Sequence, residues 1–339
     1  MWIEAQVARL KEAFSRLRDP LVVALHCAEA ASPLWDRLSE VARSLEGLGQ
    51  GMVRVEEVEA PELPALPALS LACGKGRGIS YAAVPEGPEA APFIRAIARL
   101  TGVEPSPTGA WTAQVSNHAR PAEIIVFIAP ACPFCPRTVQ GALDVALTSA
   151  QVRLSIVDVE RFPKLAAQYS VQSVPMTLVD RQLARVGILS SSELAELLVA
   201  TTERDYVERV FLSRIETGQL DDAAADLRAG RGLDHFASLW LKSTTSTRIS
   251  LMMLAEMVLE GRRMALDALV PRLLPVLSSA DVPLRGDTAD LLRQIAHPAA
   301  ADALTALLQD PNPDVAEVAA DALAAIEARR ARETGSEEA

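Results

Sequence analysis

The stretch IIVFIAPACPFCPR, residues 124–137, decides the fold predicted for this 339-residue chain. It opens with an apolar run that has the length and β-branched content of a buried strand. The run leads into a Cys-x-x-Cys pair, Cys132 and Cys135, where the pattern predicts that a helix begins. A helix N-terminus stabilises negative charge, and the thiolate is the reactive form of cysteine. The order of strand, cysteine pair and helix therefore predicts a thiol that exchanges disulfides.

Each residue of this motif has an expected role. Cys132 stands first in the pair and nearest to solvent, so we expect it to attack a disulfide. Cys135 follows one helical turn later and is expected to resolve the mixed disulfide. Pro133 fits the first turn of the helix, where its missing N–H costs nothing. Pro133 and Phe134 are expected to border the substrate groove.

A second element lies forty residues after Cys135, at Val174 and Pro175. Four segments together resemble a thioredoxin or glutaredoxin fold: 127–136, 157–160, 169–171 and 174–175. The resemblance implies that the Val174–Pro175 peptide bond is cis and that Pro175 packs against the two cysteines as part of the catalytic site. It also implies that Val174 borders the substrate groove. A cis X–Pro bond is uncommon enough to mark a deliberate feature.

The cysteine pair has two other interpretations. It could be half of a zinc site or a carrier of a metal cluster, but zinc takes four ligands and the chain has no second Cys-x-x-Cys. The four histidines are dispersed along the chain, at His26, His118, His235 and His297. The pair could also be two structural cysteines. The strand, the helix and Pro175 in register favour redox chemistry, and no metal is expected.

The first hundred residues alternate strand and helix signals in the same way as the second. An overlay at an offset of 103 places residues 21–25 on residues 124–128, and then Glu29 and Ser32 fall where Cys132 and Cys135 stand. Pro67 takes the place of Pro175. The first fold is therefore expected to be inactive and to build a groove beside the second site.

Two such folds in tandem resemble the protein disulfide oxidoreductases of thermophiles. They equally resemble the N-terminal domain of the flavoprotein subunit of bacterial alkyl hydroperoxide reductase, in which one fold is inactive. The resemblance covers about residues 1–200. Thioredoxins usually hold a buried Asp six residues before the first cysteine, where this chain has Val126. Glu123 and Asp158 lie too near strand ends to be proposed as the base that accepts the proton of Cys135. The proton-transfer base therefore stays unassigned.

Cys27 and Cys73 stand alone in the sequence. Cys73 lies six residues beyond Pro67, which is roughly 20 Å along an extended strand, so a relay between this cysteine and the active end is not expected. Both are predicted to be small buried hydrophobic residues.

From residue 203 onward the strand signals stop and apolar residues recur at spacings of three and four. A 31-residue repeat places Leu273 on Leu304 and Leu277 on Leu308. This region resembles HEAT repeats of a short kind. Stacked helix pairs of this type present concave surfaces to other proteins, which favours a protein partner on the helical repeats. The alternatives are that this region covers the thioredoxin-like units or forms a dimer.

These patterns predict an α/β pair of tandem thioredoxin-like folds followed by an all-α HEAT-like solenoid. The expected segments are a degenerate thioredoxin-like fold, a linker, a thioredoxin-like fold with the Cys-Pro-Phe-Cys site, the helical repeats and a disordered tail, at residues 1–104, 105–120, 121–202, 203–330 and 331–339 respectively.

Composition narrows the function. The net charge of −11 argues against nucleic-acid binding, and no apolar run is long enough to span a bilayer. The opening residues read as an amphipathic helix without a signal peptide, so the reducing cytoplasm is expected. Gly74, Gly76 and Gly78 form Gly-x-Gly-x-Gly, which indicates a hairpin turn rather than a dinucleotide loop. No cofactor is expected, so electrons come from an external reductase or small thiol.

Two functional hypotheses follow. In the first, the chain is a thiol–disulfide oxidoreductase, mainly a cytosolic reductase, that acts on a protein client through a mixed disulfide while the helical domain positions that client. In the second, it is a HEAT-repeat interaction scaffold whose thioredoxin-like units bind partners, with redox state at most a switch.

Overall fold

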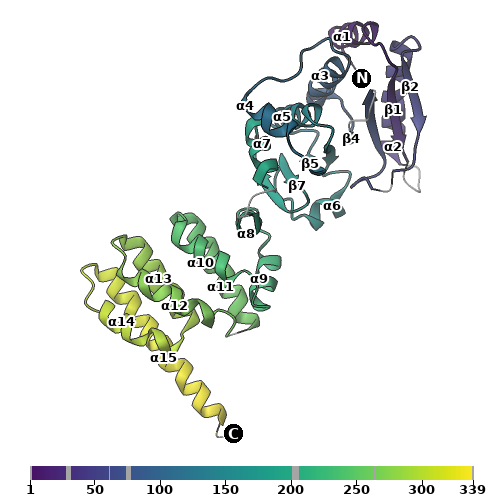
Figure 1. Cartoon of the computed structure of the whole chain (residues 1–339). Helices are drawn as coiled ribbons and strands as arrows, with labels where there is room; N and C mark the ends of the chain where they lie inside the picture. The colour runs from purple at the N-terminus through teal and green to yellow at the C-terminus, as the bar shows by residue number, and fades with distance from the viewer. Residues whose placement is uncertain are drawn as a thin grey trace. The chain divides into compact units, whose positions relative to one another are not determined.

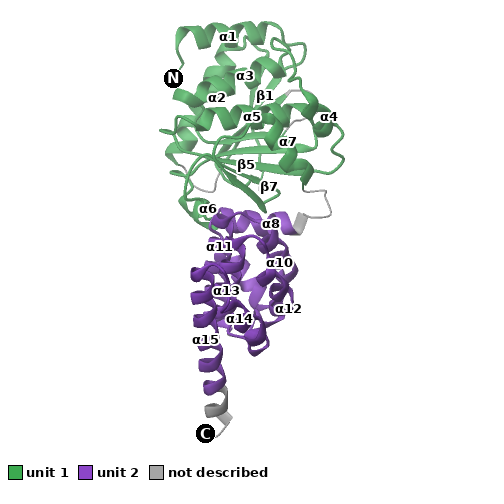
Figure 2. Cartoon of the chain, turned by 90° about the vertical axis from the view of Figure 1, so that its left-hand side faces the viewer, with its two compact units in different colours: residues 1–206 green, residues 207–339 purple. Residues whose placement is uncertain are grey.

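The computed structural model describes residues 2–27, 32–60, 62–73, 78–200, 206–262 and 264–337. The chain divides into two compact units, residues 1–206 and residues 207–339, coloured green and purple in Figure 2. Each unit has its own hydrophobic core. In the described part of the chain, no helix combines the length and the apolar character that crossing a membrane requires.

Unit 1 is built on a single sheet, whose strands are β1 Leu21–His26, β2 Val53–Glu57, β3 Ala68–Cys73, β4 Ile79–Ala82, β5 Ala122–Ile128, β6 Val152–Asp158, β7 Met176–Val179 and β8 Leu183–Val186. Within the described ranges these eight strands follow the spatial order β2-β1-β3-β4-β6-β5-β7-β8. The order contains the same four-strand pattern twice, because β5 to β8 repeat the pairing of β1 to β4. In each half the first strand pairs parallel with the second and antiparallel with the third.

The two halves join through β4 and β6, which pair in parallel. Ser80 and Ser155 lie opposite each other in this register, and their hydroxyl oxygens are 2.9 Å apart in a buried hydrogen bond. The tandem folds expected from the sequence are therefore one continuous sheet and not two separate ones. Local strand patterns contain no signal for this junction, because it depends on the edges that the two halves offer each other.

Helices pack over this sheet (Figure 1) and are α1 Glu4–Ser15, α2 Pro33–Leu48, the 3-10 turn η1 Gly87–Glu89, α3 Ala90–Leu100, α4 Ala110–Ser116, α5 Cys135–Thr148, α6 Pro163–Gln168 and α7 Ser191–Ala200. In α2, Leu34, Leu38, Val41 and Leu45 recur at intervals of three and four residues and are all buried. Contacts run from α1 to α3, from α3 to α5 and from α5 to α7, so that α3 and α5 connect the two halves.

The strand that decides the fold, β5, lies inside the sheet between β6 and β7. Its residues Ile124 to Ile128 are at most 2% exposed. A strand covered on both faces needs apolar side chains at every position and not at alternate ones. The burial of β5 therefore explains the unbroken apolar run that precedes the cysteine pair.

Unit 2 is helical throughout its described residues, with α8 Tyr206–Glu216, α9 Leu220–Arg228, α10 Leu233–Lys242, α11 Thr245–Gly261, η2 Asp267–Leu269, α12 Val270–Leu273, η3 Leu274–Ser278, α13 Val282–Ile295, η4 Pro298–Ala300, α14 Ala301–Leu307 and α15 Pro313–Glu337. Leu273 and Leu304, one repeat apart, are both buried. Leu277 is buried as well, but its counterpart Leu308 is 37% exposed because α14 ends one residue before it. The buried pattern of the repeat is therefore not kept at the end of α14.

Two expectations from the sequence differ from the structure, and two concern residues that the structure does not describe. The helix α15 continues through residues 331–337, for which the sequence predicts a disordered tail. Cys27 is exposed and not buried, since β1 ends at His26 and leaves Cys27 beyond the strand. The predicted turn at residues 74–77 and the position of Glu29 lie outside the described residues.

Candidate redox site

The cysteine pair lies between the end of β5 and the start of α5. Cys132 donates its backbone N–H to the carbonyl oxygen of Ala129 at 3.0 Å, which closes the turn after the strand. The helix begins at Cys135, with Pro136 in its first turn. Pro133 therefore precedes the helix, and the expectation that it lies in the first turn is wrong. Residues 132–134 form the turn that leads into the helix. Pro136, and not Pro133, lies in the first helical turn.

Two contacts fix the sulfur of Cys132. The backbone N–H of Cys135 donates to Cys132 Sγ over an N–S distance of 3.2 Å, and Cys132 Sγ lies 3.7 Å from the carbonyl oxygen of Val174. The first contact places the sulfur where the helix N-terminus stabilises negative charge. The second places it against the loop of Pro175. The Val174–Pro175 peptide bond is cis, which confirms the prediction.

The two thiols differ in accessibility. Cys132 is partly exposed, whereas the side chain of Cys135 is fully buried. Phe134 is 55% exposed at the tip of the turn, and Pro133 is exposed beside it. Only Cys132 can therefore meet a large disulfide substrate. Cys135 is held behind it, within reach of Cys132 and away from solvent.

Burial raises the pKa of the Cys135 thiol well above its ordinary range. The hydrogen bond with Cys132 and the nearby charge of Glu89 act in the same direction. A thiol in this state stays protonated at neutral pH, so Cys135 needs a proton acceptor before it can attack.

Glu89 is a buried carboxyl group whose charge acts on the Cys135 thiol, and sequence reasoning missed it. It ends the turn η1, which packs against α5, and its side chain is 4% exposed. Neither of its carboxylate oxygens has a hydrogen-bond partner among the described residues. Burial raises its pKa from near 4.5 to about 7. No local pattern marks Glu89 in the sequence, because Glu86, another acidic residue, stands only three positions earlier.

The hydroxyl of Tyr81 shares this interior region. It is fully buried and has no hydrogen-bond partner within the described part of the chain. Burial raises the pKa of Tyr81 well above its ordinary value, and the charge of Glu89 raises it further. Glu89 thus acts electrostatically on both Tyr81 and Cys135, which places it between the first half and the redox pair.

The two carboxyl groups considered from sequence have other partners. Glu123 forms an ion pair with Arg181 at 2.6 Å, at the opposite end of β5 from the cysteines. Asp158 accepts a hydrogen bond from the backbone N–H of Glu160 at 2.9 Å, although burial raises its pKa. Neither interacts with Cys135 in the manner of Glu89.

Apolar side chains from both halves surround the loop of Pro175. Leu63 and Leu66 from the first half, together with Tyr169 and Val174 from the second, are partly buried against one cluster of core residues. The Leu66–Pro67 bond is also cis, so each half presents a cis-proline immediately before its third strand. The first half thereby contributes apolar side chains to the same cluster that Val174 packs against.

The first half has a different group at its helix start. Ser32 caps α2, and its hydroxyl oxygen accepts the N–H of Trp35 at 3.2 Å.

His26 has both ring nitrogens bonded, to the Val58 carbonyl at 2.8 Å and the Ser70 hydroxyl at 2.9 Å. Cys73 pairs with Leu21, at the opposite end of β1 from Cys27. The two residues therefore lie at opposite ends of one strand pair.

Among the residues that the structure describes, no group of three or more His, Cys, Asp or Glu side chains is placed to hold a metal ion.

Comparison with known proteins agrees with this description of the fold. Residues 122–199 match the family described as thioredoxin domain, and residues 270–334 match HEAT repeats. The comparison with curated proteins finds no match.

Two solved structures resemble unit 1. One is the NTD_N/C domain of alkylhydroperoxide reductase AhpF from Enterococcus faecalis, with 20% identity and a TM-score of 0.52 over 58% of this chain and 100% of that one. The other is a protein disulfide oxidoreductase from Aeropyrum pernix, with 18% identity and a TM-score of 0.49 over 59% of this chain and 93% of that one. At these identities the first likeness shows the fold alone. The chain therefore combines a thioredoxin-like α/β unit with HEAT repeats.

Proposed function

We propose that this protein is a thiol–disulfide oxidoreductase that reduces a disulfide in a protein client through Cys132 and Cys135. The observation that carries the proposal is the position of the Cys132 sulfur. It lies 3.2 Å from the amide nitrogen that opens α5 and 3.7 Å from the carbonyl of Val174. A partly exposed sulfur at a helix N-terminus, with a second thiol buried directly behind it, is the arrangement that dithiol exchange requires.

The reaction has two displacement steps. The Cys132 thiolate attacks one sulfur of the client disulfide, a new S–S bond forms, and the first client sulfur leaves as a thiolate that takes a proton from water. Cys135 then loses its proton and attacks the Cys132 sulfur of the mixed disulfide. This attack releases the second client thiol and leaves a Cys132–Cys135 disulfide. The client gains two electrons, and an external reductase or small thiol returns them to the protein.

Glu89 is the proposed proton acceptor for Cys135. A carboxyl group with a pKa of about 7 is divided between its two protonation states near neutral pH, which suits a general base. Its lack of hydrogen-bond partners leaves its oxygens available to the thiol. The base would therefore come from the first half of the sheet and not from the strand that precedes the cysteines.

The client is expected to lie across the loop of Pro175. Val174, Pro133 and Phe134 from the second half and Leu66 from the first half offer it apolar surface around a partly exposed sulfur. Main-chain hydrogen bonding at Val174 would orient an extended segment next to Cys132. The reducing cytoplasm suits this direction of exchange.

The decisive experiment is trapping. Cys135→Ser should accumulate mixed disulfides through Cys132, because the resolving step is blocked while the attack remains possible. Cys132→Ser is the matched control and should trap nothing. The proposal is overturned if Cys135→Ser forms no mixed disulfide and the intact protein reduces no protein disulfide.

The HEAT match supports a second candidate function, an interaction scaffold. In that case the redox pair is at most a switch, and partners bind without forming a covalent bond. The variant with both Cys132→Ser and Cys135→Ser distinguishes the two functions. Capture of the same partners by this variant, together with no reductase activity of the intact protein, would favour the scaffold.

A further inference from the structure

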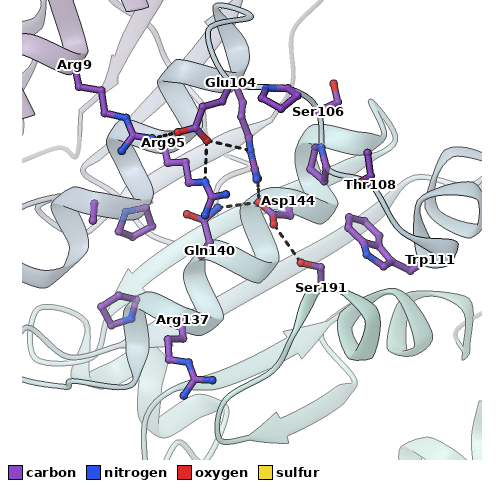
Figure 3. Close-up of a pocket in the computed structure, with 16 residues that line it drawn as sticks. Arg9, Arg95, Glu104, Ser106, Thr108, Trp111, Arg137, Gln140, Asp144 and Ser191 are labelled. Atoms are coloured by element: carbon purple, nitrogen blue, oxygen red, sulfur yellow. Dashed lines mark hydrogen bonds and ion pairs between the residues drawn. The ribbon is translucent and has the colours of Figure 1, made fainter.

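A large open cavity lies beside the redox helix, between α3, α5 and the connector that follows α3. Its volume is about 1040 Å³, and Figure 3 shows the side chains that surround it. Pro136 and Arg137 form one end of its wall, next to Cys135, and the wall continues along α5 to Asp144. A second cavity of about 450 Å³ adjoins it and shares Arg137 and Asp144. The proposed redox chemistry uses neither space.

Arginine side chains dominate the charge of this cavity. Glu104, in the connector, forms ion pairs with three of them: Arg9, Arg95 at 2.9 Å and Arg99 at 3.8 Å. One carboxylate cannot neutralise three guanidinium groups. Arg137 adds a fourth positive charge, and the described residues supply it with no ion pair. The concentration of positive charge stands out because the whole chain carries a net charge of −11.

Arg99 is the buried member of this group. Its side chain is 8% exposed, and it also forms an ion pair with Asp144. Its Nε atom is buried and has no hydrogen-bond acceptor in the described structure, since Glu104 is too distant at 3.8 Å. Burial and the charge of Arg95 both lower the pKa of Arg99. A buried guanidinium beside another cation, with an N–H left unbonded, is stabilised by an additional anion.

The acidic side chains of the cavity do not cancel this excess. Asp144 accepts hydrogen bonds from Gln140 at 2.8 Å and from Ser191 at 3.3 Å, in addition to its ion pair with Arg99. Asp144 and Glu104 therefore have their oxygens engaged. Four guanidinium groups against two carboxylates leave two positive charges within the cavity, and the N-terminus of α5 adds its positive dipole end at Arg137.

The remaining wall suits an organic molecule and not a bare ion. Trp111 lines the cavity, and Pro92, Pro105 and Pro107 offer further apolar surface. Ser106 and Thr108 add hydroxyl groups at the same rim. An indole face and proline rings can hold a flat or apolar body while the guanidinium groups bind oxygen anions.

We propose that this cavity is a binding site for a small organic molecule that carries two negative charges on phosphate or carboxylate oxygens. Its anionic end would be held by Arg95, Arg99 and Arg137, and its body would lie against Trp111. The site would be separate from the dithiol, because its polar groups are on α3, on the connector and on the outer face of α5.

Isothermal titration of the full chain with AMP, inorganic phosphate and succinate tests this proposal. AMP carries a phosphate dianion on a flat ring, and succinate carries two carboxylates. Binding of AMP or phosphate without succinate identifies phosphate as the anion, and the reverse identifies carboxylate. Tryptophan fluorescence should change on binding in the wild type and should not change in Trp111→Phe. The proposal is overturned if none of the three probes binds at millimolar concentration.

Arginine variants locate the binding. Arg137→Gln and Arg95→Gln should each weaken the affinity about tenfold, the usual cost of losing one charge-assisted contact. Arg54→Gln, an exposed arginine on β2, is the matched control and should bind as the wild type does. Circular dichroism confirms that each variant is folded. The variant with Cys132→Ser and Cys135→Ser should retain full affinity, so a failure of the redox proposal leaves this result independent. Unchanged affinity in both arginine variants would place the ligand elsewhere and refute the site.

Discussion

The two halves of the unit 1 sheet share one strand arrangement, but they carry different side chains at the start of the helix that follows their first strand. In the first half, the Ser32 hydroxyl accepts the N–H of Trp35 at the start of α2. In the second, the Cys132 sulfur accepts the N–H of Cys135 at the start of α5, over the same distance of 3.2 Å. Both halves place a cis-proline before their third strand. In each half a side chain near the helix start accepts the N–H of the residue three positions later, but only sulfur can also exchange a disulfide.

This difference separates what the fold needs from what the chemistry needs. A helix cap, an apolar strand and a proline are sufficient to build each half. The first half has no cysteine at its helix cap, yet it supplies Glu89 and Leu66 to the neighbourhood of the second. Under the proposed function, the first half would take part in the reaction by completing the site of the second half.

The largest expected effect concerns the cysteines of the two halves. Cys132→Ser should lower disulfide reductase activity at least about a thousandfold, because it removes the attacking sulfur. Cys27→Ser, which changes the exposed thiol of the first half, should leave the activity unchanged. The measurement is turnover of a protein disulfide with each variant. Equal losses in the two variants would contradict the assignment of the active half.

The next effect concerns stability. Burial raises the pKa of Glu89 from near 4.5 to about 7, so the native protein binds more protons than the unfolded chain between these values. Glu89 should therefore contribute a loss of roughly 3 kcal/mol of unfolding free energy as the pH rises from about 4 to about 8. This contribution is fully present below pH 4.5 and is lost as the pH rises through 7.

Glu89→Gln should lack this loss, which urea unfolding at a series of pH values measures. Glu86→Gln is the matched control. Glu86 lies on the same loop as Glu89, but its side chain is 41% exposed and pairs with Arg37 of α2. The control should keep the pH dependence of the wild type. Identical pH dependence in wild type and Glu89→Gln would show that the carboxyl group is not held protonated.

The same substitution tests the catalytic role of Glu89. Glu89→Gln should lower kcat/KM for protein disulfides about a hundredfold at pH 7, the usual contribution of a general base. The wild-type rate should rise with pH as Glu89 loses its proton near pH 7, and the variant should lack that rise. Retention of the step near pH 7 in the variant would assign it to another group.

The smallest effect concerns the junction of the halves. Ser80→Ala and Ser155→Ala should each cost about 1 kcal/mol of unfolding free energy, because each removes the buried hydrogen bond between the two hydroxyls. The double variant should cost less than the two single variants added together. Ser15→Ala, at an exposed helix end, should cost less. Strict additivity in urea unfolding would show that the two hydroxyls are not coupled.

Much of this fold and site could be predicted from local sequence. The apolar run before Cys132, the spacing to Cys135 and the Val174–Pro175 pair all lie within segments of a few residues, where periodicity and turn chemistry are informative. The 31-residue repeat indicated the helical unit in the same way. The predicted position of Pro133 was wrong, because α5 begins at Cys135 with Phe134 as its N-cap, and Pro133 lies before both.

Glu89 shows what local patterns cannot supply. It precedes Cys132 by 43 residues and lies in the other half of the sheet. A carboxylate in a sequence is by default a solvated residue, and only the packing of η1 against α5 buries it beside Cys135.

The sequence by itself therefore predicted the elements of this protein and the cysteine pair proposed to react, because strand, helix start and cysteine spacing are properties of neighbouring residues. Tertiary structure alone decided that the two halves share one sheet, that Glu89 is buried and acts electrostatically on the Cys135 thiol, and that four arginines line one cavity. These relations depend on residues far apart in the chain, and burial or charge crowding arises only once the chain has brought them together.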